Sequence, residues 1–302
     1  MAVREKMKRE LEVFRRFLLE FFRLYTTKQI NRSSAALCYF LVMTFFPLII
    51  LLYTMLGSNY GLALRGIRMM EGLVAEGTLK TIRDFVRYVA TNVNRNMTVA
   101  AAIVLVGSAS AGVRTLQSGI GDLQGHRRYQ GVFDLIFSIV FSVVLVVAIY
   151  ASIVILVSGR QLINFINAHI PFVDISLSWD SLRFLVLALI IYLLLLGVYQ
   201  LARPVGERYH THNGAIFATI AIVAVSYVFS AIIGNSARYP LVYGSMASVI
   251  LLMMWMYTSC IVIFCGAAMN IALRNVKREL RQQRSMEKQT EEAAAQHSDA
   301  EG

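Results

Sequence analysis

The 302-residue sequence is 57% hydrophobic and 16% charged, with 29 Lys and Arg against 18 Asp and Glu and a formal net charge of +11. Soluble domains are about 45–50% apolar and about 25% charged, so this composition excludes an ordinary soluble domain. The three cysteines lie inside apolar stretches, which excludes a disulfide scaffold and favours small buried side chains. We therefore expect an all-α, polytopic membrane helical bundle.

Residues 1–32 predict a basic amphipathic helix on the cytoplasmic surface of the membrane. They carry nine Lys and Arg and no apolar core of a signal peptide. Apolar side chains recur at helical spacing among the charges, namely Met7, Leu11, Phe14, Leu18, Phe21, Phe22 and Tyr25. The alternative, a helix packed on a soluble core, is disfavoured because the chain offers no such core.

Uncharged stretches then predict six transmembrane helices in a membrane domain of residues 33–273. The expected spans are about 35–56, 96–113, 135–159, 184–202, 213–237 and 245–273. The second is the shortest and contains the small-residue run Gly107–Gly112, which predicts close helix packing and little lipid contact.

The connections on the outer side predict amphipathic interfacial helices. The first connection places apolar residues on one face, namely Ile82, Phe85, Val86, Val89 and Val93. The second does the same over residues 162–170, before Pro171. Residues 274–302 predict a charged cytoplasmic tail that is partly disordered.

The distribution of basic residues predicts the orientation. With the N-terminus in the cytoplasm, the cytoplasmic segments hold 20 Lys and Arg and the opposite face holds nine. The positive-inside rule therefore favours both termini in the cytoplasm.

Several short segments together resemble the YihY/BrkB family of bacterial inner-membrane proteins. The first are Ser34–Tyr39 and Thr44–Pro47, and the others follow in the family's order: Gly107–Arg114, Arg203–Pro204 with Gly214–Ala215, Tyr243–Ala247, Trp255–Tyr257 and Gly266–Asn270. The resemblance covers residues 15–275 and implies a six-span protein of the bacterial inner membrane, linked in some members to virulence and serum resistance, with no agreed biochemical activity.

The chain departs from the family at two positions. Asn213 stands where the family often has Pro, and Ala268 stands where it often has Glu. Any charge coupling that this Glu carries in relatives is absent here.

Some members of the family were formerly labelled ribonuclease BN, but the residues disfavour that chemistry. The His210-Thr-His212 segment lacks the Asp and the third His that a metallo-β-lactamase-type nuclease would carry. The sequence also lacks a nucleophile elbow, a P-loop and a dinucleotide-binding fingerprint. We expect no enzyme activity, no catalytic residues, no metal and no cofactor.

The basic residues flank the spans and form no stripe interleaved with stacking aromatics. We therefore expect membrane lipids, and no nucleic acid, as partners. The oligomeric state stays open.

Polar side chains within or at the ends of spans are costly in hydrocarbon and predict an interior substrate path. Arg114 follows Ser110 by about one helical turn, and Arg203 ends the fourth span on the same side, so both arginines could form one cytoplasmic anion site; snorkelling is the alternative for Arg114. Pro47 predicts a kink that lines a cavity or serves packing alone. The proposed path comprises Tyr39, Thr44, Pro47, Ser108, Ser110, Arg114, Arg203, Tyr243, Ser245 and Asn270. An interhelical hydrogen bond is the alternative reading of the polar residues.

We therefore expect a transporter or flippase-like protein that handles a lipid or another anionic amphipathic envelope substrate. The alternative is a non-transporting envelope scaffold that binds partners through its outer helices and tails. A ribonuclease is the disfavoured third reading.

Overall fold

The computed structural model of the chain describes residues 2–55, 60–69, 76–125, 135–152, 179–203, 209–234 and 247–300. The secondary structure of these residues is helical, without strands. The helices are α1 (Ala2–Thr27), α2 (Ile30–Met55), α3 (Tyr60–Met69), α4 (Glu76–Asn92), α5 (Arg95–Gln124), the helix Leu135–Ser152, α7 (Trp179–Leu201), α8 (His212–Gly234) and α10 (Ala247–Ala300). The predicted all-α fold is confirmed.

Five helical segments of the described chain are long and apolar enough to cross a membrane. They are Ile30–Thr54, Arg95–Gln124, Leu135–Ser152, His212–Ala231 and Val249–Met286. A shorter apolar segment, Leu185–Leu201, lies in α7. Each of the six expected spans thus corresponds to an apolar helix, and the chain is a multi-pass membrane protein.

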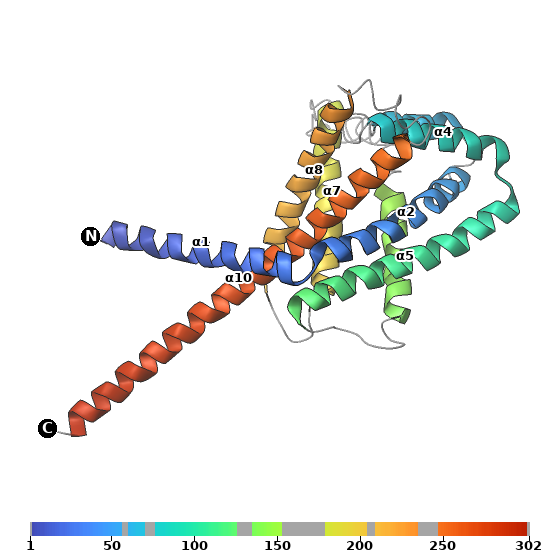
Figure 1. Cartoon of the computed structure of the whole chain (residues 1–302). Helices are drawn as coiled ribbons and strands as arrows, with labels where there is room; N and C mark the ends of the chain where they lie inside the picture. The colour runs from blue at the N-terminus through green and yellow to red at the C-terminus, as the bar shows by residue number, and fades with distance from the viewer. Residues whose placement is uncertain are drawn as a thin grey trace, which may run out of the picture.

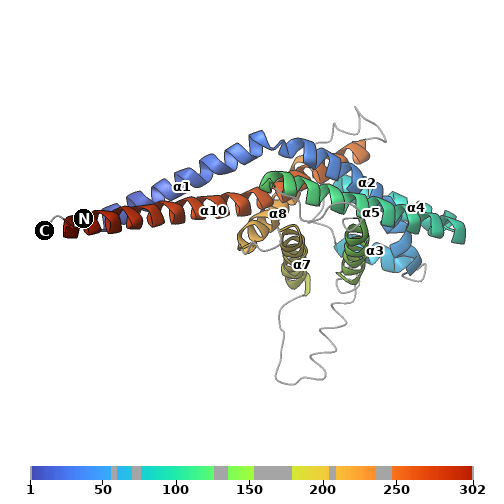
Figure 2. The same cartoon turned by 90° about the horizontal axis from the view of Figure 1, so that it is seen from below.

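The helices form two groups that cross each other (Figure 1). In one, α7 and α8 lie side by side; in the other, α2 and α5 pack along each other. Helix α10 contacts both groups. Helix α1 and the second half of α10 project from the same side of the bundle in both views (Figures 1 and 2).

Helix α5 is longer than the apolar stretch that predicted it. Asn94 caps its start by accepting a hydrogen bond from Met97 N (2.9 Å), and Gly125 ends it in the left-handed region at φ 78°. The charge of Arg114 ends the apolar stretch, but it does not end a helix, since Arg is a good helix former.

One prediction about α5 is wrong. Gly112 does allow close packing, because a Cβ at this position would lie 3.5 Å from Phe40 Cβ. However, Val99, Ile103 and Val104 are exposed, so one face of α5 is open rather than internal.

Helix α4 confirms the first predicted amphipathic helix. Ile82, Val86 and Val89 are buried against neighbouring helices, whereas Lys80 and Arg87 are exposed. The second predicted amphipathic segment, residues 162–170, lies outside the described residues.

The second half of α1 packs against the middle of α10, and the two helices diverge toward the chain termini (Figure 1). Leu24 of α1 is buried in the core that α10 shares, and Asn275 Nδ2 donates to Glu20 Oε1 at 2.8 Å. The tail that we expected to be partly disordered continues as helix to Ala300. Its Glu, Lys, Arg, Gln and Ala residues are strong helix formers, and no Pro or Gly interrupts them.

Candidate functional site

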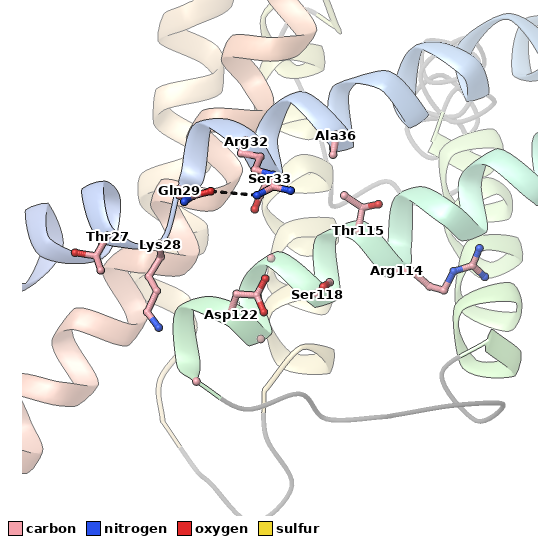
Figure 3. A pocket seen from close by; sticks show the side chains of 13 residues that line it. Thr27, Lys28, Gln29, Arg32, Ser33, Ala36, Arg114, Thr115, Ser118 and Asp122 are labelled. Carbon is pink, nitrogen blue, oxygen red and sulfur yellow. Dashed lines mark hydrogen bonds between the residues drawn. The ribbon is translucent and has the colours of Figure 1, made fainter.

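A cavity of about 1130 Å³ lies between the α1–α2 turn and the last part of α5 (Figure 3). We call it the α2–α5 pocket. It is lined by Thr27, Lys28, Gln29, Arg32, Ser33, Ala36, Arg114, Thr115, Ser118, Gly119, Gly121, Asp122 and Gly125.

The turn between α1 and α2 builds one wall of this pocket. Gln29 adopts φ 52°, in the left-handed region that non-glycine residues rarely occupy. Lys28 N donates to Leu24 O at 3.1 Å, and Arg32 N donates to Gln29 O at 2.9 Å. The chain therefore changes direction within two residues, which places Lys28 and Arg32 on the pocket.

The C-terminal part of α5 builds the facing wall. Arg114, Ser118 and Asp122 are four residues apart and share one helix face. Arg114 Nη1 donates to Ser110 Oγ at 3.0 Å, and Ser110 is buried. Ile120 is buried in the core of the bundle and fixes the opposite face of this segment. The predicted pairing of Ser110 with Arg114 on one face is thus present as a hydrogen bond.

Three cationic residues, Lys28, Arg32 and Arg114, and one carboxylate, Asp122, line the pocket, and the Arg114 side chain extends away from Arg32 and Asp122 (Figure 3). The formal charge of the pocket is therefore positive. Guanidinium groups bind carboxylates and phosphates through two parallel hydrogen bonds, which favours an anionic ligand. Typical ligand pockets occupy about 300–1,000 Å³, so this cavity has room for more than a simple ion.

An exposed apolar strip adjoins the pocket. On α2, Tyr39 and Met43 follow Arg32 at helical spacing and are 58% and 44% exposed. On α5, Ile103 and Val104 precede Arg114 and are 70% and 49% exposed. At 1.5 Å rise per residue, the strip reaches about 16 Å from Arg32 to Met43. A charged pocket therefore leads into a surface that hydrocarbon can cover.

Thr44 and Ser108, two predicted path residues, join α2 to α5. Thr44 Oγ1 donates to Ser108 Oγ at 3.0 Å and lies 2.7 Å from Phe40 O. Thr44 also lines a smaller apolar cavity of about 120 Å³. Pro47 lies inside α2, which continues from Ile30 to Met55.

Among the described path residues, only Arg114 lines the α2–α5 pocket. Arg203 Nη1 donates to Tyr209 O at 3.4 Å instead of sharing the pocket of Arg114. Asn270 is 2% exposed; its Oδ1 accepts from Gly214 N at 2.7 Å, and its Nδ2 donates to Thr211 O at 3.0 Å. The Asn270 contacts correspond to the interhelical hydrogen bonds of the alternative reading, whereas both residues of the Arg203 contact lie between α7 and α8. The remaining path residues, Tyr243 and Ser245, lie outside the described residues.

Four further residues line the pocket that the sequence did not single out, namely Lys28, Arg32, Ser118 and Asp122. The two basic residues belong to the segment predicted as a surface helix, and the two polar residues follow the apolar stretch. The four-residue spacing from Arg114 to Ser118 to Asp122 was the available signal.

One histidine of the His210-Thr-His212 segment has a local partner in the structure. His212 Nδ1 lies 2.8 Å from Tyr192 Oη, within hydrogen-bond distance. Among the residues that the structure describes, no three His, Cys, Asp or Glu side chains are grouped as metal ligands.

The chain matches the family described as Virulence factor BrkB over residues 21–291. It is 26% identical to the ribonuclease-like protein YfkH of Bacillus subtilis over 268 residues, which cover 87% of this chain and 96% of that protein. It is 38% identical to a UPF0761 membrane protein of Alteromonas mediterranea over 64 residues, which cover 21% of this chain and 22% of that protein. A UPF0761 membrane protein of Verminephrobacter eiseniae is 30% identical over 95 residues, which cover 32% of this chain and 22% of that protein. No solved structure matches the chain.

Proposed function

The chain belongs to the BrkB virulence factor family of membrane proteins, and from this premise we propose that it transports an anionic amphipathic molecule, such as a lipid or envelope precursor. The charged group of this substrate binds in the α2–α5 pocket. Its apolar part lies along the exposed strip of Tyr39, Met43, Ile103 and Val104.

The observation that supports this proposal is a positive pocket with exposed apolar side chains on the same two helices, after Arg32 on α2 and before Arg114 on α5. A site for a small soluble anion needs no apolar extension. A surface that only faces lipid needs no polar cavity beside it. A lipid-like anion uses both features, because its headgroup needs cations and its chains need hydrocarbon contact.

We place the protein in the bacterial inner membrane with both termini in the cytoplasm. The projection of α1 and α10 from the same side supports termini on one face (Figure 1). The surplus of basic residues on the segments at that face supports the cytoplasmic assignment. The α2–α5 pocket then opens to the inner leaflet.

The test is translocation of a fluorescent phosphatidylglycerol in liposomes that contain the purified protein. Dithionite bleaches only label that reaches the outer leaflet, so a translocating protein increases the bleached fraction over empty vesicles. The substitution Arg114→Gln removes one cation from the pocket. It should slow translocation about fivefold, because each basic residue contributes about 1 kcal/mol to the binding of an anionic lipid.

Arg15→Gln is the matched control. Arg15 is exposed on α1 and does not line the pocket, so the same change in charge should leave the rate unchanged. Equal slowing in both variants would show a general charge effect. Absence of translocation by folded protein with anionic lipids would reject lipid transport.

A non-transporting envelope scaffold is the second candidate. One face of α1 supports it, because Leu11, Phe14, Leu18 and Phe22 recur at helical spacing and are exposed. A scaffold retains its cellular phenotype when Arg114 and Arg203 are replaced by Gln, provided that the variants insert and fold. A transporter that uses Arg114 loses the phenotype.

The name of YfkH makes a ribonuclease the third candidate. The histidine segment argues against it, because His212 is hydrogen-bonded to Tyr192 and no Asp or third His follows in the motif. A nuclease would cleave RNA as purified protein and lose this activity with a chelator and with His210→Ala.

A further inference from the structure

A second cavity, of about 190 Å³, lies where α10 leaves its apolar stretch and passes the start of α8. We call it the α8–α10 pocket. It is lined by Tyr209, His210, Asn213, Asn270, Leu273, Arg274, Lys277, Arg278 and Arg281.

Four basic residues of α10 face this pocket. Arg274, Lys277, Arg278 and Arg281 are three or four residues apart, so they share one helix face. The described residues that line the pocket include no Asp or Glu. Four cationic side chains on one helix face give the cavity a positive potential, which favours an anionic ligand.

Helix α8 adds to the positive potential. It begins at His212, against the pocket, and the N-terminus of a helix carries a partial positive charge. Asn213, in the first turn, lines the cavity. The pocket thus combines the start of a long helix with four cationic side chains.

Contacts among the lining residues and with α5 hold the walls of this pocket in place. The Arg274 guanidinium lies 5.2 Å from the centre of the Tyr209 ring, a cation–π contact. Gln124 Nε2 of α5 donates to Tyr209 Oη at 3.0 Å. Asn270 ties α10 to the start of α8 through Gly214 and Thr211. The arrangement does not depend on a ligand to hold the two helices together.

We propose that the α8–α10 pocket binds a phosphate oxyanion, carried by the headgroup of an anionic phospholipid or by a soluble phosphate ester. The cavity holds a phosphate group but not a whole lipid. The basic face begins directly after the apolar segment and extends about 10 Å, while each headgroup layer is about 5–8 Å thick. This site is separate from the α2–α5 pocket, and phosphate binding here does not require that the protein transports a substrate.

The test measures binding of a fluorescent phosphatidylglycerol to the full-length protein in neutral detergent by anisotropy. The measurement uses an Arg32→Gln/Arg114→Gln background, which removes two cations of the α2–α5 pocket. In this background, Lys277→Gln/Arg281→Gln should raise the dissociation constant about 30-fold, or about 2 kcal/mol at 1.4 kcal/mol per tenfold. All four substituted residues are exposed or half-buried, so the variants should fold. Thermal unfolding of each variant checks this.

The matched control is Arg15→Gln/Arg284→Gln, which removes two exposed charges outside the pocket. This control should change the dissociation constant less than about twofold. Competition by millimolar glycerol 3-phosphate would assign the site to soluble phosphate esters, whereas competition by unlabelled phosphatidylglycerol alone would assign it to a headgroup. An equal effect of both double substitutions, no effect of either, or equal competition by phosphatidylcholine would overturn the proposal.

Discussion

The α2–α5 and α8–α10 helix pairs both pack through small and polar residues, yet one contact is open, beside a cavity of about 1130 Å³, and the other is closed except for the α8–α10 pocket of about 190 Å³ at its end. Between α2 and α5, Thr44 and Ser108 form a hydrogen bond, and the outward faces of the pair remain exposed around a large cavity. Between α8 and α10, Gly214 lies against Gly266, and Asn270 is buried with its amide hydrogen-bonded to α8.

The polar groups at the two contacts differ in whether they can still bind a ligand. The Asn270 amide is satisfied inside the protein on both its oxygen and its nitrogen, so it has little capacity left for a substrate. Arg114 donates one hydrogen bond to Ser110 and also lines the α2–α5 pocket. Since an arginine side chain has five N–H donors, Arg114 retains capacity for an anion.

The largest expected effect comes from filling the closed contact. In Gly214→Ala, the new Cβ would overlap the Gly266 carbonyl oxygen and the Asn270 amide. Because a backbone atom cannot move aside cheaply, we expect a loss of about 3 kcal/mol in the free energy of unfolding. Thermal and denaturant unfolding in detergent measure it.

Gly107→Ala is the control for this prediction. Gly107 is also helical, but a Cβ there meets nothing within 4 Å. The substitution should raise stability by up to about 1 kcal/mol, because Ala has the higher helix propensity. Similar losses in both variants would show that the two contacts do not differ.

The next effect concerns the hydrogen bonds of the closed contact. Asn270→Ala leaves the buried Gly214 N–H without its side-chain acceptor, while Thr211 O keeps the bond from Ala215 N. We expect a loss of about 2 kcal/mol in the free energy of unfolding. Asn96→Ala, at an exposed position of α5, should change it by less than about 0.5 kcal/mol. If Asn270→Ala weakened substrate binding without lowering the free energy of unfolding, Asn270 would be a residue of the substrate path after all.

The open contact should behave in the opposite way. Arg32→Gln/Arg114→Gln removes two pocket cations, so the affinity for phosphatidylglycerol at this pocket should fall about 30-fold. The free energy of unfolding should change by less than about 1 kcal/mol, because neither residue is buried. Binding titrations and unfolding curves on the same preparations check both values. A large loss of stability would indicate that these arginines hold the fold.

The smallest effect comes from the turn that forms one wall of the open pocket. Gln29 has φ 52°, which costs a non-glycine residue about 1 kcal/mol or more. Gln29→Gly relieves this strain but increases the conformational entropy of the unfolded chain. We therefore expect the free energy of unfolding to rise by only about 0.5 kcal/mol. Gln29→Val should destabilise, since a β-branched residue fits this conformation poorly. Unfolding temperatures that rank the valine variant above the glycine variant would contradict the turn geometry.

The sequence predicted the helical membrane fold because long uncharged stretches have few alternative structures. It also placed Arg114 and Ser110 on one helix face from their spacing. It did not distinguish Asn270, whose amide is hydrogen-bonded on both its oxygen and its nitrogen, from Arg114, which donates to Ser110 from one of its five N–H groups. That difference depends on Gly214, distant in sequence, approaching α10 closely. The pocket contributions of Lys28 and Arg32 depend on the unusual backbone of Gln29, which no local pattern predicts.

The most direct test of the open pocket is crosslinking with a phosphatidylglycerol that carries a photoreactive group in its acyl chain. In vesicles with the full-length protein, we expect crosslinks to concentrate on peptides that contain Tyr39, Met43, Ile103 and Val104. These crosslinks should fall strongly in Arg32→Gln/Arg114→Gln and persist in Arg15→Gln/Arg284→Gln. Crosslinks that spread evenly over other exposed apolar helices, such as Leu135–Ser152, or that ignore the loss of the pocket arginines, would contradict the account.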